Sequence, residues 1–179
     1  MARDAIFQRF LQNQAAEAQA LNAASDVVSI TPLASGPGAA QHFLARFSCG
    51  GYIKNEAGAI VKHNRWDVGV YFPDDYLRCA NPGQVVTLLA PQAVFHPNIR
   101  DGHVCMGERF LAPGTALVEI IHQVHAILTY NKWSGQGLNE DASLWAMSNA
   151  SLLPADRRSL KRRVLRLDIE VAGANGGRS

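Results

Sequence analysis

Hydrophobic positions recur at helical spacing at the start of the chain and then change to a strand-like alternation. Residues 4–24 are rich in Ala, Gln and Leu and contain neither Gly nor Pro. Within them Ile6, Phe10, Leu11 and Leu21 can share one face of a helix. The pattern therefore predicts a helix from Asp4 to Ala24.

Four short runs of β-branched and aromatic residues follow, separated by Gly and Pro. They predict strands at Val27–Ile30, His42–Cys49, Trp66–Phe72 and Val85–Leu89. In the second run Phe43, Ala45 and Phe47 alternate with more polar neighbours, as expected of a strand with one buried face. The segment from Lys54 to Gly58 is expected to be a connection.

Residues 91–114 have little periodicity, and a loop of this length without regular structure tends to be functional. A buried helical stripe follows, with Thr115 as its expected N-cap; its members are Leu117, Ile120, Ile121, Val124, Ile127 and Leu128. Asn139 is expected to cap another helix, and Pro154 to begin a last basic helix. The order of elements predicts an α+β fold with a four-stranded antiparallel meander sheet, a single domain over residues 1–172 and a flexible tail over 173–179.

Composition narrows the class of protein. The formal net charge of +2 argues against general nucleic-acid binding, and no apolar run approaches the roughly 20 residues that span a membrane. The three cysteines are widely spaced and form no CxxC pair, so free thiols in the cytoplasm are expected. Cys49 and Cys79 are expected to be small buried hydrophobic residues.

Cys105 lies in the long loop. It is preceded in the chain by the tetrad His96-Pro97-Asn98-Ile99 and then by Gly102 and Val104. This arrangement resembles the active-site signature of ubiquitin-conjugating enzymes. Other pieces stand in the family's order: Phe72-Pro73-Asp74-Asp75-Tyr76 resembles its FPxDYP stretch, Pro113 precedes an apolar helix, and Leu138-Asn139 with Ala142 resembles the start of its next helix. Motifs cover roughly residues 72–142.

The resemblance implies a ubiquitin-conjugating-type fold in which Cys105 accepts a ubiquitin-like modifier as a thioester from an activating enzyme and passes it to an amine of a protein substrate. Asn98 would stabilise the tetrahedral oxyanion or hold the loop that does so, and His96 would brace the loop by hydrogen bonds. The helix from Asp4 to Ala24 would dock the activating enzyme. No cofactor is implied.

The sequence also departs from the family's pattern. His96 and Cys105 are nine positions apart, against the usual ten, and the loop Trp133–Gly137 lacks the carboxylate that helps deprotonate an incoming lysine. Glu140 or Asp141 could substitute for it. Such divergence resembles the bacterial members of the family, which are encoded in small operons linked to defence against phage.

Three other interpretations start from the same residues. His122 and His125 are three positions apart and could, with His96, His103 and Cys105, hold zinc; no acidic ligand accompanies them, and both are expected to face water. Cys105 with His96 or His103 could form a hydrolase pair. A non-catalytic module that only binds ubiquitin-like proteins is the third, but such modules lack the reactive cysteine.

Overall fold

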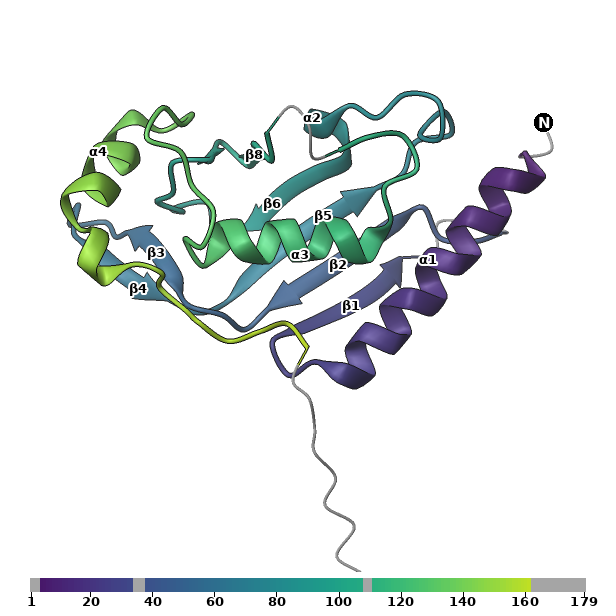
Figure 1. Cartoon of the computed structure of the whole chain (residues 1–179), viewed down its shortest axis with the longest axis horizontal. Helices are drawn as coiled ribbons and strands as arrows, with labels where there is room; N and C mark the ends of the chain where they lie inside the picture. Colours follow the sequence, from purple (N-terminus) through teal and green to yellow (C-terminus); the bar gives the residue numbers. More distant parts are fainter. Residues whose placement is uncertain (1–3, 34–37, 108–110, 162–179) are drawn as a thin grey trace, which may run out of the picture.

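The computed structural model describes residues 4–33, 38–107 and 111–161, in which two helices cover one face of an antiparallel sheet (Figure 1). The helices are α1 (Ala5–Ala24), the short α2 (Pro82–Val85), α3 (Leu117–Leu128) and α4 (Glu140–Ser148), with a 3-10 turn at Ala150–Leu152. The strands are β1 (Val28–Leu33), β2 (His42–Phe47), β3 (Gly51–Lys54), β4 (Ile60–His63), β5 (Trp66–Tyr71), β6 (Val86–Ala90), β7 (Ile99–Arg100) and β8 (His103–Val104). No helix in these ranges is long and apolar enough to cross a membrane.

The main sheet has six strands in the order β1-β2-β5-β6-β8-β7, and every pairing in it is antiparallel. Its first four strands are the four that the sequence predicts. The predicted count of four is wrong, because the long loop adds the two-residue strands β8 and β7 at one edge. Runs of two residues carry no detectable alternation, so the sequence could not reveal them.

A second, two-stranded sheet pairs β3 with β4, where the sequence predicted only a connection. Gly58 has a φ of +78° in the turn, and the Asn55 side chain accepts a hydrogen bond from the N–H of Ala59 at 2.8 Å. The β3 strand also bonds to the start of the long loop, since the N–H of Phe95 donates to the Tyr52 carbonyl at 2.9 Å. The hairpin therefore supports the loop that carries Cys105.

The core lies between the sheet and the helices α1 and α3. All six apolar residues of the predicted stripe on α3 are buried, and so are Phe43, Ala45 and Phe47 on β2. On α1 the buried positions are Phe7, Leu11, Gln14, Ala18 and Leu21, which repeat at intervals of four and three. Ile6 is 71% exposed, so the prediction that it shares a helix face with Leu11 and Leu21, which are both buried, is wrong.

Specific side chains determine where α3 and α4 begin. Asn139 caps α4, as expected, by accepting a hydrogen bond from the N–H of Ala142 at 3.1 Å. Thr115 does not cap α3, because its hydroxyl donates to the Ala112 carbonyl at 2.8 Å. The N-cap of α3 is Ala116, whose N–H donates instead to Glu119 Oε2 at 3.3 Å.

Residues 154–161 form no helix, so the predicted last helix is wrong over this range; its remainder and the predicted tail lie outside the described residues. An ion pair fixes the segment instead. Asp156 accepts hydrogen bonds from Arg158 at 2.7 Å and from the N–H of Gly50 at 2.8 Å, which hold the pKa of its carboxyl well below the usual range. Arg158 also donates to the Ser48 carbonyl at 2.6 Å. These bonds favour an extended path along the end of β2 over a helix.

Replacing Gln14 with Ala should destabilise the protein by about 1–3 kcal/mol. Gln14 is 3% exposed, and its Oε1 accepts the N–H of Leu117 at 2.6 Å, which joins α1 to the first turn of α3. The variant leaves that N–H without an acceptor inside the core. Urea denaturation should show the loss, whereas Gln12→Ala, at an exposed position of the same helix, should stay within about 0.5 kcal/mol of wild type. Equal effects at the two positions would contradict this account.

Candidate functional site

A tight hairpin brings Cys105 back beside the residues that precede it. β7 and β8 are joined by Asp101 and Gly102, whose φ angles of 51° and 78° suit the two-residue type I′ turn. The chain continues from β8 directly into Cys105, whose N–H donates to the Asn98 carbonyl at 2.8 Å. The turn chemistry therefore sets Asn98 opposite Cys105.

The side chain of Asn98 is only 7% exposed and bonds on both sides of its amide. Nδ2 donates to the Cys105 carbonyl at 3.1 Å, and Oδ1 accepts the N–H of Ser134 at 3.1 Å. One side chain thus joins the strand that ends at Cys105 to the connection between α3 and α4.

His96 is buried beneath the same loop. Its Nδ1 accepts the N–H of Asn98 at 3.0 Å, and its ring lies 4.2 Å from that of Tyr130. Burial lowers the pKa of His96 to about 3, although the Ile127 carbonyl opposes this shift. The ring is therefore neutral at physiological pH, with its proton on Nε2 and the lone pair of Nδ1 already used. His96 has no free lone pair with which to take a proton from Cys105.

The connection that follows α3 braces the loop, and we call residues 130–139 the bracing segment. The Tyr130 hydroxyl donates to the Phe95 carbonyl, and Lys132 Nζ donates to the Met106 carbonyl at 2.8 Å. At the far end of the segment the N–H of Asn139 donates to the Pro97 carbonyl at 3.1 Å. These bonds, together with that of Ser134, hold the loop from Phe95 to Met106.

Gly137 allows this close approach. A Cβ atom at this position would lie 2.3 Å from the Pro97 carbonyl oxygen, so the backbones could not meet with any larger residue. The sequence analysis noted this glycine only as part of a loop without a carboxylate. It did not identify Tyr130, Lys132, Ser134 or Gly137 as part of the site, because the residue that each contacts there lies more than 25 positions away in the chain.

The three thiols lie in different environments. Cys49 is fully buried, as expected, and burial raises its pKa to about 12. Cys79 is exposed at the end of the turn after Pro73, so its predicted burial is wrong. Cys105 is half-buried. Within the described ranges, Cys79 and Cys105 are the cysteines that solvent reaches.

The histidines of α3 do not form a metal site. No group of three or more His, Cys, Asp or Glu side chains in the described part of the chain could hold a metal ion. His125 packs against Phe47 and is 7% exposed, so the expectation that it faces water is wrong. Burial lowers the pKa of both His122 and His125.

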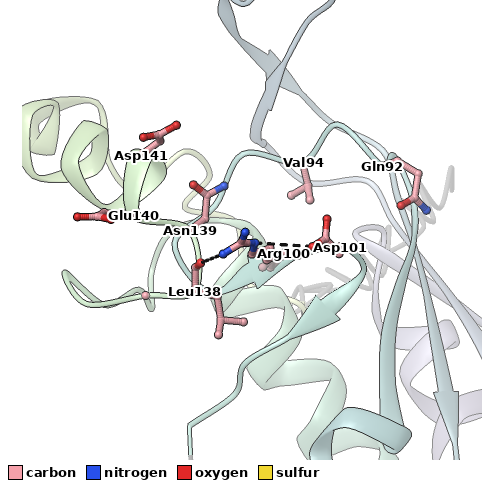
Figure 2. A pocket seen from close by; sticks show the side chains of 10 residues that line it. Gln92, Val94, Arg100, Asp101, Leu138, Asn139, Glu140 and Asp141 are labelled. Carbon is pink, nitrogen blue, oxygen red and sulfur yellow. Dashed lines mark hydrogen bonds and ion pairs between the residues drawn. The ribbon is translucent and has the colours of Figure 1, made fainter.

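A hollow of about 540 Å³ lies between the β7–β8 turn and the start of α4 (Figure 2). Arg100 crosses it, donating to the Leu138 carbonyl at 3.4 Å and pairing with Asp101 at 3.7 Å. Glu140 and Asp141 line the hollow, but the side chain of Glu140 points away from Arg100. Cys105 is not among the residues that line it, so the structure brings neither carboxylate to the thiol through this hollow.

No model of a known protein family and no curated protein sequence matches the chain. Among solved structures, 46 chains match its fold. One is the E2 domain of a ubiquitin-conjugating enzyme from Toxoplasma gondii, with a TM-score of 0.52 and 14% sequence identity over 81% of this chain and 89% of that one. The chain has a ubiquitin-conjugating-type fold. At this level of identity the likeness concerns the fold alone.

Replacing His96 with Asn should weaken the dependence of stability on acid pH. Because the folded pKa is about 3 and the unfolded value about 6.5, the unfolded wild-type chain binds more protons between these values. Titration of His96 therefore lowers the free energy of unfolding by up to about 1.4 kcal/mol per pH unit as the pH falls through this window. Above the unfolded pKa it has no effect on stability. Asn can still accept the N–H of Asn98 but does not titrate.

Denaturation with urea at a series of pH values from about 7 to about 4.5 tests this. The variant should be less stable than wild type at neutral pH, because it loses packing against Tyr130. The difference between the two proteins should shrink as the pH falls. A difference that stays constant over the series would show that His96 is not held neutral in the folded protein.

Proposed function

We propose that this protein carries a ubiquitin-like modifier as a thioester on Cys105, receives it from an activating enzyme and transfers it to an amine of a protein substrate. The observation that carries the proposal is the half-exposed thiol of Cys105 held opposite Asn98, within a ubiquitin-conjugating-type fold. The departures from the family motif support a bacterial origin. In this proposal the protein acts in the cytoplasm and is encoded in an operon for defence against phage.

The chemistry consists of two acyl transfers. In loading, the Cys105 thiolate attacks the carbonyl carbon of the modifier's thioester; a new C–S bond forms, and the activating enzyme's cysteine leaves as a thiolate. In discharge, a neutral amine attacks the carbonyl carbon on Cys105; a C–N bond forms, the C–S bond breaks and Cys105 leaves as a thiolate. The proton of the amine passes to a solvent base, since the loop Trp133–Gly137 holds no carboxylate.

Asn98 can serve the discharge step. Its Nδ2 group carries two N–H donors, and the Cys105 carbonyl occupies one of them. We assign the second to the oxyanion that develops during discharge, where a positioned amide donor contributes most. The bond from Ser134 to Oδ1 fixes the amide in one orientation before the reaction begins.

Loading should be abolished by Cys105→Ala and unaffected by Cys79→Ala. Cys79 is the matched control, because it is the other cysteine that solvent reaches in the described ranges. The protein is mixed with its candidate activating enzyme, modifier and ATP, and non-reducing and reducing gels are compared. We expect a band shifted by one modifier that reductant removes. In Cys105→Ser the shifted band should resist reductant, since an oxygen ester replaces the thioester.

An activating enzyme that is charged but gives no shifted band would overturn the carrier function for that pair. Binding of the modifier without a covalent band would favour the non-catalytic module. Steady release of free modifier from the loaded enzyme, with no acceptor amine present, would favour a hydrolase.

Asn98→Ala should slow discharge about 100- to 1000-fold while loading continues. The loss follows from removal of the donor to the oxyanion. Discharge is followed as disappearance of the preformed thioester after addition of free lysine. Asn64→Ala, at an exposed position before β5, should discharge at the wild-type rate. If Asn98→Ala loses loading and discharge equally and melts at a lower temperature, Asn98 only holds the loop and does not stabilise the oxyanion.

A further inference from the structure

A single buried hydroxyl group ties the bracing segment to α4. Ser143 lies near the start of that helix and is 1% exposed. Its Oγ shares one proton between the Asn139 carbonyl at 3.0 Å and the Ser134 carbonyl at 3.3 Å. The same oxygen accepts the N–H of Gly137 at 3.3 Å. One side chain thus bonds to three residues of the segment.

Ser134 is held through both of its backbone groups. Its N–H donates to Asn98 Oδ1 at 3.1 Å, and its carbonyl accepts from Ser143. At the other end of the Asn98 amide, Nδ2 donates to the Cys105 carbonyl at 3.1 Å. Since an amide oxygen accepts and an amide nitrogen donates, these bonds decide which end of the Asn98 amide faces Cys105.

The other two residues bonded to Ser143 both contact Pro97. A Cβ at Gly137 would lie 2.3 Å from the Pro97 carbonyl oxygen, and the N–H of Asn139 donates to that oxygen at 3.1 Å. Residues 134–139 contain no helix or strand, so their backbone groups need partners elsewhere to keep one conformation. Ser143 supplies such partners from a regular helix.

Ser148 on the same helix provides a comparison. Its Oγ donates to the Leu144 carbonyl at 3.0 Å, four positions back in the chain, and the residue is exposed. Ser143 makes the equivalent bond to Asn139 and adds the bonds to Ser134 and Gly137. The difference between the two serines is therefore the connection to the site.

We propose that Ser143 is a positioning residue of the site, which acts through Ser134 to keep Nδ2 of Asn98 directed at Cys105. The effect on transfer rests on the proposed function, but the orientation of the amide does not. In discharge the oriented amide presents its second N–H to the oxyanion as the C–N bond forms. Without the Ser143 hydroxyl, Ser134 can move away from Oδ1, and the amide loses one of the bonds that fix it.

NMR spectroscopy of the full chain tests the orientation without any modifier or activating enzyme. The side-chain amide protons of Asn98, identified by their absence in Asn98→Ala, and the N–H of Ser134 are followed as they exchange with solvent. In Ser143→Ala both should exchange about three- to ten-fold faster, as expected when one typical hydrogen bond is lost. In the control Ser148→Ala both should exchange at the wild-type rate.

Discharge rates test whether Ser143 acts through Asn98. With preformed thioester and free lysine, Ser143→Ala should discharge about three- to ten-fold more slowly while loading continues at the wild-type rate. Ser148→Ala should match wild type in both steps. In the Asn98→Ala background, Ser143→Ala should have no further effect, because the amide that it positions is absent.

A folded Ser143→Ala protein with wild-type amide exchange and discharge would overturn the proposal. So would equal slowing of discharge with and without Asn98, because that result assigns Ser143 to stability alone. Faster amide exchange in Ser143→Ala, together with no thioester on wild-type protein, would sustain the positioning of Asn98 and remove the proposed function.

Melting temperatures show whether each variant remains folded. If Ser143→Ala does not fold, exchange in the wild-type protein gives the answer, since the N–H of Gly137 reports directly on its bond to Ser143. Protection of this N–H would support the proposal, and exchange at the rate of an unbonded amide would overturn it.

Discussion

The backbone from Phe95 to Met106 contains only two strands of two residues each, so most of its N–H and C=O groups need partners from elsewhere. An unpaired backbone group in a water-poor region costs free energy comparable to a lost hydrogen bond. The bracing segment supplies some of those partners, through the Tyr130 hydroxyl, the Lys132 ammonium and the N–H of Asn139. The N–H of Ser134 bonds instead to the side chain of Asn98. The position of Cys105 therefore depends on a second irregular segment, and neither segment could keep its conformation alone.

This mutual support explains why polar side chains are buried at the site. Asn98 and His96 are 7% and 1% exposed, yet each bonds to backbone groups of the loop. Hydrogen bonds in a region of low dielectric are strong, so these bonds hold the loop firmly. The close contact of Gly137 with Pro97 adds a steric limit to these bonds. The thiol is thus held by groups that are themselves fixed before any partner binds.

The sequence predicts what depends on near neighbours in the chain. Alternation along β2 and the stripe on α3 identify their buried faces, and the tetrad ahead of Cys105 contains residues that the structure brings together beside the thiol. Predictions that depended on distant neighbours were wrong. Ile6 and Phe7 are adjacent, and only the direction in which α1 packs on β1 and α3 decides which of them is buried. Cys79 is exposed because a turn, rather than a strand, carries it. Lys132 carries no local pattern at all, since its partner Met106 is 26 positions away.

A carrier cysteine must attack one thioester and later leave another, and these demands limit how strongly its thiolate can be stabilised. Nucleophilicity falls as the pKa of a thiol falls, whereas a thiol of lower pKa leaves faster. An adjacent imidazolium, as in cysteine hydrolases, stabilises the thiolate strongly, and its conjugate base can activate water against the acyl enzyme. The nearest imidazole in the motif, His96, is buried and neutral, with its Nδ1 bonded to Asn98. His96 therefore supplies neither an imidazolium nor a base to Cys105. Such an environment suits a thioester that must survive in water until an amine arrives.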